Sequence, residues 1–294
     1  MPVLSLVCFV VGGLLGWTAS RSGPQVQRVW PIVLRAQILL TSVSLSLVAA
    51  WRLTGLGQLV GPLFLAGGLW VMFAATLLSR GRRSRGEGSL EAWAVSPNSG
   101  YWVVPAATAF AGSAGTMVAV LANVANTAQN AVCIHLLRRD APISQRRSTR
   151  WVDQSPILAS VIGLLLHVAG SAPAATSDVL TLAGPLLAFS GAALFAGSVA
   201  HPHNLSVGQS TGAVRRWGWL TVVRVAYFLL IALCASSTPL RVVAVVSALS
   251  APAFQPIQLA VLYGYRSGVV NAAVRWGWVL APLGLGLGAL VRWG

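Results

Sequence analysis

The stretch S-P-N-S-G-Y-W-V-V-P-A-A-T-A-F-A-G-S-A-G, residues 96–115, decides the fold class of this chain. It is apolar enough to lie inside a membrane, yet it contains Pro97 and Pro105 among amide and hydroxyl side chains. Proline removes a backbone donor and clashes with the preceding helical turn. In lipid, the freed carbonyl groups must find partners within the protein. The stretch therefore predicts a membrane helix broken near Pro105, with a further helix after Gly112.

A second stretch of the same kind, S-A-P-A-F-Q-P-I-Q, covers residues 250–258. Interrupted helices at corresponding places in two halves of a chain point to a binding site near the bilayer midplane. Half-helix N-termini at such breaks offer free N–H groups and a positive dipole end, which favour an anion. The alternative at each break is a kinked helix that only packs tightly. The candidate substrate-binding residues at the two breaks are Asn98, Ser99, Pro105, Pro252, Gln255, Pro256 and Gln258.

The composition extends the membrane interpretation to the whole chain of 294 residues. Hydrophobic residues make up 56% and charged residues 9%, whereas a soluble domain carries about 25% charged residues. The net charge of +15 comes from arginines that lie between apolar runs rather than along one polar face. This distribution indicates membrane topology signals and argues against nucleic-acid binding.

Ten apolar runs approach the roughly 20 residues that a helix needs to cross the hydrocarbon core. Tryptophan prefers the membrane interface, and most of the twelve tryptophans lie at or near the ends of these runs. The sequence therefore predicts an all-α polytopic membrane protein with lipid as its solvent. Its predicted spans are residues 2–19, 31–50, 58–79, 92–111, 114–137, 156–170, 178–200, 219–236, 240–263 and 269–291.

The arginines also predict an orientation. With the N-terminus outside, seventeen arginines fall on the inner side, and Arg52, Arg241 and Arg292 fall on the outer side. Cytoplasmic loops carry an excess of basic residues, so this split supports both the number of spans and their direction. We expect a multi-pass protein of the cytoplasmic membrane with both termini outside.

The longest polar stretch divides the spans into two sets of five. It predicts a first repeat at residues 1–137, a basic cytoplasmic linker at 138–155 and a second repeat at 156–294. Because five is odd, the two sets must have opposite orientations in the membrane. Inverted repeats of this kind build many secondary transporters.

Helix five of this plan carries a row of amides. Asn123, Asn126 and Asn130 share one helical face. A buried amide in a membrane is costly without partners, so this face must point into protein or a cavity. We take these three residues as further substrate-binding candidates, with interhelical hydrogen bonding as the alternative.

Arg224 and Arg275 lie several residues inside predicted spans. We expect both side chains to extend to the cytoplasmic interface, and pairing with an anionic substrate is the alternative. The sequence shows no clustered acid, histidine or nucleophile suited to catalysis and no GxxxxGK loop for ATP. It predicts neither a metal site, nor a cofactor, nor an enzyme.

The motif Asn98-Ser99-Gly100-Tyr101 with Pro105, followed by Gly112-Ser113-Ala114-Gly115 and an asparagine-bearing helix, resembles the auxin efflux carrier family of membrane transport proteins. Ser250-Ala251-Pro252-Ala253 with the later Leu262-Tyr263-Gly264 resembles its second signature. The resemblance implies that helices four and nine are broken and cross, with substrate bound near Asn98, Pro105, Pro252 and Gln255. It also implies a moving domain of helices 3–5 and 8–10, and a scaffold of helices 1, 2, 6 and 7 that forms a homodimer.

The chain departs from some relatives in its acidic residues. All five lie in predicted loops or at helix ends: Glu87, Glu91, Asp140, Asp153 and Asp178. A carboxylate proton relay at the bilayer centre is therefore not expected. Together with the resemblance, the sequence predicts a secondary transporter that moves a small organic anion or similar metabolite across the cytoplasmic membrane by alternating access. The alternative is a non-transporting membrane scaffold or sensor built on the same fold.

Overall fold

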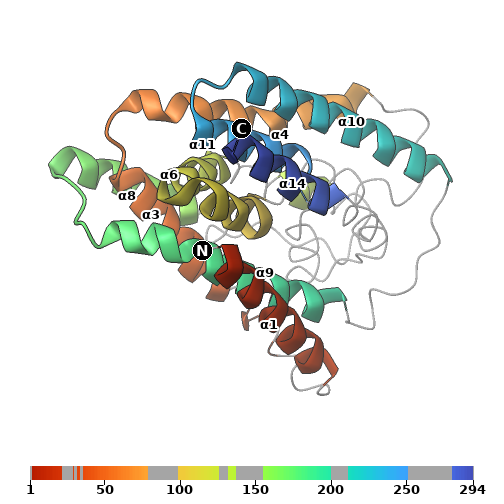
Figure 1. Cartoon of the computed structure of the whole chain (residues 1–294), viewed down its shortest axis with the longest axis horizontal. Helices are drawn as coiled ribbons and strands as arrows, with labels where there is room; N and C mark the ends of the chain where they lie inside the picture. Colours follow the sequence, from red (N-terminus) through yellow and green to blue (C-terminus); the bar gives the residue numbers. More distant parts are fainter. Residues whose placement is uncertain are drawn as a thin grey trace.

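The computed structural model describes residues 2–21, 29, 32–33, 36–78, 99–125, 132–136, 155–199, 211–250 and 280–293. Every regular element in this part of the chain is helical (Figure 1). The α-helices are α1 (Pro2–Arg21), α3 (Val43–Trp51), α4 (Val60–Leu78), α6 (Val104–Ala125), α8 (Ser155–Ala169), α9 (Thr176–Val199), α10 (Thr211–Cys234), α11 (Thr238–Ala248) and α14 (Leu280–Trp293). Two π-helical turns, η1 (Ile38–Ser42) and η3 (Ser99–Val103), and a 3₁₀ turn, η2 (Leu56–Leu59), complete the described elements.

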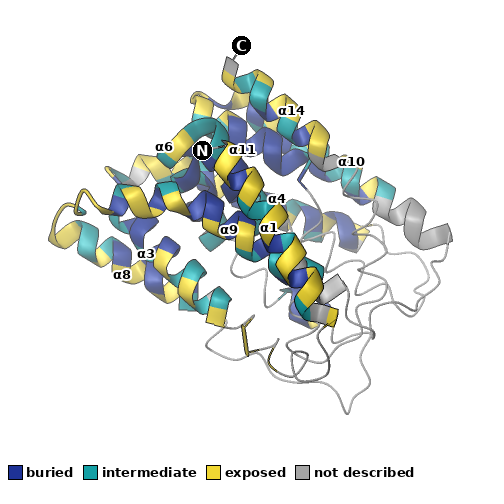
Figure 2. Cartoon of the chain, turned by 60° about the horizontal axis from the view of Figure 1, so that its bottom comes forward, coloured by how far each residue is buried: buried dark blue, intermediate teal, exposed yellow. Residues whose placement is uncertain are grey.

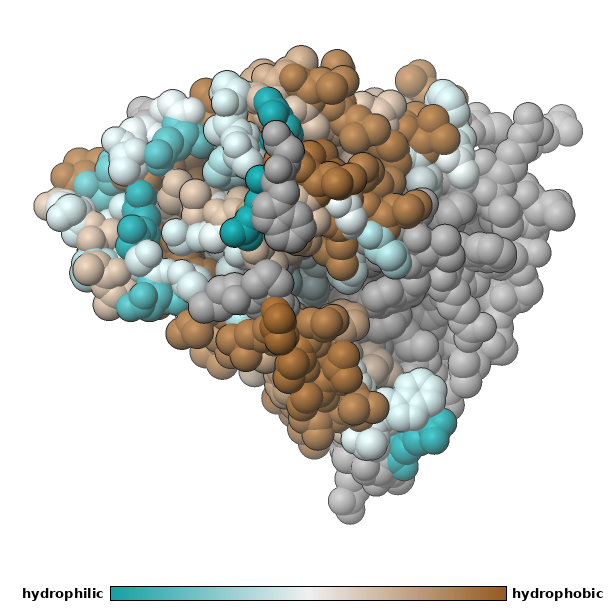
Figure 3. Space-filling view, viewed as in Figure 1, coloured by the Kyte–Doolittle hydropathy of each residue, from teal (hydrophilic) through white to brown (hydrophobic). Residues whose placement is uncertain are grey.

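Three segments of the described chain are long and apolar enough to cross a membrane: Gly57–Thr76, Gly100–Val124 and Thr176–Leu194. The apolar stretches of the other helices are shorter, at 10–17 residues. Their outward faces carry large exposed hydrophobic side chains, such as Val3, Leu6 and Leu14 on α1. Figure 3 shows this hydrophobic surface over α1, and Figure 2 shows exposed residues along α1 and α8. The all-α prediction is confirmed for the described residues, and the apolar spans indicate a membrane protein.

Glycines let pairs of helices approach until their backbones touch. A Cβ atom added at Gly12 or Gly16 of α1 would collide with the backbone of Phe189 or Ala193 on α9. This four-residue spacing is the small-x-x-x-small pattern of close helix packing in membranes. Gly163 of α8 approaches the backbone of α3 in the same way. The described helices therefore form two tight pairs, α1 with α9 and α3 with α8.

Helix α6 folds against itself at Gly112. Its φ of 60° and ψ of −151° lie in a region that only glycine adopts readily. The hydroxyl oxygens of Thr108 and Thr116 are 2.7 Å apart although eight residues separate them, a separation of about 12 Å along a straight helix. The two arms, 104–111 and 113–125, meet where the sequence predicted the boundary between the fourth and fifth spans.

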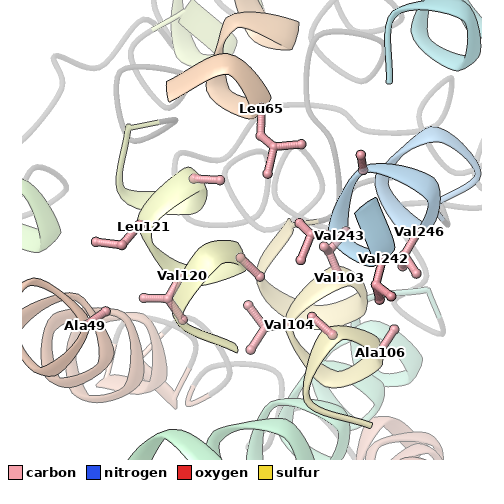
Figure 4. Close-up of a cluster of buried hydrophobic side chains, with 14 of the residues drawn as sticks. Ala49, Leu65, Val103, Val104, Ala106, Val120, Leu121, Val242, Val243 and Val246 are labelled. Carbon is pink, nitrogen blue, oxygen red and sulfur yellow. The ribbon is translucent and has the colours of Figure 1, made fainter. Parts of the chain in front are cut away.

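The core forms around α11 and the arms of α6. All residues from Val242 to Ala248 are buried, so α11 is enclosed by other elements on every side. Figure 4 shows the side chains that meet here, from α6, η3, α11, α4 and α3. The labelled members of this cluster are Ala49, Leu65, Val103, Val104, Ala106, Val120, Leu121, Val242, Val243 and Val246.

The three arginines predicted on the outer side each bind a helix end. Arg52 donates to the hydroxyl of Thr176 at 2.9 Å, and Arg241 donates to the carbonyl of Ala235 at 3.0 Å. Arg292 donates to the carbonyl of Ala109 at 2.9 Å, beside the turn at Gly112. Each of these contacts joins two helix ends that the sequence places on the outer side of the membrane. The contacts therefore agree with the predicted alternation of helix directions. Orientation and the number of spans stay predictions.

Helix α11 ends well inside the predicted ninth span of 240–263. Its last helical residue is Ala248, and Leu249 leaves helical geometry with φ −108° and ψ 23°. Pro252 explains this end, because its nitrogen cannot donate to the carbonyl of Ala248 and the residue before a proline avoids the α conformation. Residues 251–279 lie outside the described part. The predicted linker 138–155 also lies outside it, apart from Ser155, which begins α8.

We predict that Gly16→Ala destabilises the protein by about 1–3 kcal/mol, the usual cost of overpacking. The added methyl group would force α1 away from the backbone of Ala193. Gly13→Ala is the matched control, because its Cβ would lie 4.0 Å from Ala192. The control should be neutral or gain about 0.5–1 kcal/mol in helix propensity. Thermal unfolding of both variants in detergent measures the difference, and equal stability would contradict the close packing.

Candidate functional site

The side chain of Arg224 lies inside the protein rather than at an interface. It is on α10 and is 3% exposed. Its Nη2 atom donates to the carbonyl oxygen of Ser250 at 3.4 Å, just beyond the end of α11. The expectation that Arg224 extends to the cytoplasmic interface is therefore wrong, since packing against α11 takes the guanidinium inward. Arg275 lies outside the described residues.

Two buried polar atoms at this contact have no hydrogen-bond partner in the part of the chain that the structure describes. They are Nε of Arg224 and Oγ of Ser250, whose residue is 0% exposed. A guanidinium carries five N–H donors, and the 3.4 Å contact is long beside the roughly 2.7–2.9 Å of a strong charge-assisted bond. Within the described part of the chain, most donors of the Arg224 guanidinium and the hydroxyl of Ser250 are therefore unused.

The positive charge of Arg224 also lacks a counter-ion within the described part of the chain. Asp178 is the acidic residue described there, and it is exposed in the first turn of α9. Removing an ion from water costs several kcal/mol even after the protein relaxes. The negative end of the α11 dipole offsets part of this cost. An anion bound beside Arg224 would offset the rest.

The depth of this contact in a membrane would follow from the lengths of α10 and α11, if both helices cross it. Arg224 precedes the end of α10 at Cys234 by ten residues, and Ser250 follows the start of α11 at Thr238 by twelve. At a rise of 1.5 Å per residue these separations are about 15 and 18 Å. The hydrocarbon core of a bilayer is about 30 Å thick. If α10 and α11 cross it, Arg224 and Ser250 lie near its middle.

A second polar cluster joins the two π-helical turns. The hydroxyl of Tyr101, in η3, donates to Oε1 of Gln37 at 2.5 Å. Nε2 of Gln37 donates to the hydroxyls of Thr41, in η1, at 3.0 Å and of Ser190, on α9, at 3.4 Å. Gly191 makes room for Tyr101, because a Cβ there would lie 2.6 Å from that of Tyr101. π-helical turns inside helices are frequent at functional sites.

Asn123 comes close to the same π-helical turn. Its Nδ2 atom would lie 4.0 Å from a Cβ built on Gly100, so the second arm of α6 brings this amide to η3. Tyr101 and Asn123 each lie eleven residues from the turn at Gly112, or about 16 Å along a helix. The structure therefore brings the first predicted break and the first asparagine of helix five together.

The remaining predicted site residues divide into two groups. Pro105 is buried in the first turn of α6, and Ser99 begins η3. The others lie outside the described residues: Asn98, Asn126, Asn130, Pro252, Gln255, Pro256 and Gln258.

Sequence reasoning missed Gln37, Thr41 and Ser190 as members of a site, and it placed Ser250 in the second break without naming it as a candidate. The sequence did contain a signal for Gln37, because its amide side chain lies inside an apolar run. The same unusual placement identified Asn123 in helix five. Nothing in the spacing of Thr41 or Ser190 distinguishes them from hydroxyls that bond to their own helix. The described residues hold no group of three metal-ligating side chains.

We predict a coupling of about 1 kcal/mol between Tyr101 and Gln37, the net scale of one hydrogen bond. Tyr101→Phe removes the donor and Gln37→Leu removes the acceptor, so the double variant should lose less stability than the two single losses together. Thermal unfolding of the four proteins gives the coupling. Additive losses would show that the two side chains do not interact.

Comparisons with protein-family models, curated proteins and solved structures gave no match to this chain. The resemblance to auxin efflux carriers therefore stays a prediction based on the motifs around Tyr101 and Pro252.

Proposed function

We propose that this chain is a secondary transporter that moves a small organic anion across the cytoplasmic membrane by alternating access. The observation that carries the proposal is the buried guanidinium of Arg224, which lies without a described counter-ion at the end of α11. Charged side chains inside a membrane protein are rare, and they mark substrate or ion pathways. An anionic substrate would supply the missing charge at this point.

The pairing of the helices supports the proposed inverted repeat. Counted along the predicted spans, α1 and α9 are the first and seventh, while α3 and α8 are the second and sixth. In an inverted repeat, the first span is equivalent to the sixth and the second span to the seventh. The contact of the first span with the seventh is then equivalent to the contact of the sixth span with the second, and both contacts are present. The contact of α4 with α10, the third and eighth spans, maps onto itself.

Irregular backbone supports two interrupted helices. The π-helical turn η3 ends two residues before Pro105, and α11 stops at Ala248 before Pro252. Helix α11 packs against both η3 and α6, which brings the fourth and ninth spans together as the proposal requires. Non-helical backbone at membrane depth is tolerated where it is buried in protein or lines a cavity.

The charge of Arg224 suits anion recognition rather than proton coupling. Arginine stays protonated in proteins, so this residue can hold an anion but cannot release a proton during a cycle. The hydrogen bond between Gln37 and Tyr101 joins the proposed scaffold, spans 1, 2, 6 and 7, to the proposed moving domain. In this proposal the bond must break each time the two domains move. The lipid bilayer and a second copy of the chain are the proposed partners.

We predict that Arg224→Met lowers anion uptake at least tenfold, about 1.4 kcal/mol, without lowering thermal stability. A buried charge without a counter-ion is costly, so an apolar side chain of similar length in its place should not lower stability. The measurement is uptake of radiolabelled acetate, butyrate, benzoate, succinate and malate into proteoliposomes. Arg241→Gln is the control, because Arg241 binds a helix end away from the candidate site.

Two outcomes would contradict the proposal. Uptake by Arg224→Met at the parental rate would place the substrate elsewhere. If the parent protein, folded and inserted, takes up none of the five acids, the transport proposal fails. Binding without uptake would support the scaffold or sensor instead.

A further inference from the structure

We infer that the site at Arg224 selects a solute carrying a single carboxylate and rejects the corresponding dicarboxylate. The inference rests on the proposed function and narrows its substrate class. It is built on two residues from different helices, Arg224 of α10 and Ser250 beyond α11, which meet inside the protein.

The charge balance sets the valence of the solute. Arg224 is the charged side chain among the buried residues that the structure describes. One carboxylate neutralises one guanidinium, so a monoanion leaves no net charge in the site. A second carboxylate would enter the same apolar surroundings without a described cation to pair with, and an unpaired buried charge is strongly unfavourable.

The unused donors set the chemical group. Nε of Arg224 and Oγ of Ser250 are both buried and have no hydrogen-bond partner among the described residues. An ionised carboxylate has two acceptor oxygens and no donor, so one oxygen accepts from Nε–H and the other from the hydroxyl. The carbonyl of Ser250 keeps its contact with Nη2 in this arrangement. A carboxamide of the same shape lacks the charge and brings N–H donors of its own, so it fits poorly.

The apolar neighbours of Arg224 and Ser250 favour a hydrophobic body on the solute. Leu220 and Phe228, one turn to either side of Arg224 on α10, are both buried. Val245 and Val246, on the last turn of α11 before Ser250, are buried as well. A second charge or a hydroxyl-rich body would lose its hydration against these side chains.

The test is isothermal titration of the purified full-length protein in detergent with two matched series. One series is benzoate, benzamide and isophthalate, and the other is butyrate, butyramide and succinate. In at least one series the monocarboxylate should bind at least tenfold more tightly than both the amide and the dicarboxylate. Arg224→Met should abolish this binding and Ser250→Ala should weaken it severalfold. Arg241→Gln, at the outer end of α11, should bind like the parent.

Three results would overturn the inference. They are the lack of a tenfold monocarboxylate preference in both series, parental affinity in Arg224→Met, and no binding by any probe up to about 10 mM, a concentration that detects millimolar dissociation constants. Failure of this inference is separable from failure of transport. If the parent and Arg224→Met take up succinate at the same rate, the protein is a transporter but the single-carboxylate site is rejected. Benzoate binding without benzoate uptake would keep the site and reject transport.

Discussion

Carbonyl groups at the C-terminal ends of helices have no N–H donor within the helix, and inside a bilayer there is no water to donate a hydrogen bond instead. In this protein, arginine side chains fill that role at three places. Arg241 binds the carbonyl beyond the end of α10, Arg292 binds a carbonyl of the first arm of α6, and Arg224 binds the carbonyl of Ser250. The first two contacts are at predicted outer ends. Only Arg224 among these three is buried. Its hydrogen bond to a carbonyl beyond a helix end therefore also places a positive charge in the apolar interior.

The fold that holds this charge depends on close backbone packing. Gly12, Gly16 and Gly163 bring α1 against α9 and α3 against α8, and the turn at Gly112 folds α6 onto itself around the core. Van der Waals packing of this kind drives helix association in lipid, where the hydrophobic effect between helices is absent. It surrounds α11 so completely that the end of this helix can stop within the protein. The functional proposal builds on this enclosure, because it holds the guanidinium of Arg224 and the hydroxyl of Ser250 away from lipid.

The sequence predicted those features that depend on composition and on local backbone chemistry. The apolar runs predicted an all-helical chain, and Gly112 predicted the boundary between two spans. Pro252 predicted an interrupted helix, and α11 ends four residues before it. The side-chain environment of Arg224 was predicted wrongly, because hydropathy gives the depth of a residue but not which neighbour it faces. The Gln37–Tyr101 contact joins residues 64 positions apart, so no local pattern could indicate it. The inverted repeat and the crossing of two broken helices stay predictions, since much of the second break lies outside the described residues.

The most direct measurement places a single cysteine at Ser250 in a protein whose three native cysteines, Cys8, Cys133 and Cys234, are replaced. Anionic and cationic methanethiosulfonate reagents of similar size are then compared for their rates of reaction with it. If Arg224 creates an anion site reached from water, the anionic reagent should react at least about tenfold faster, equivalent to 1.4 kcal/mol. Adding Arg224→Met should remove that difference. An equal or faster reaction with the cationic reagent, or no reaction with either, would contradict the account.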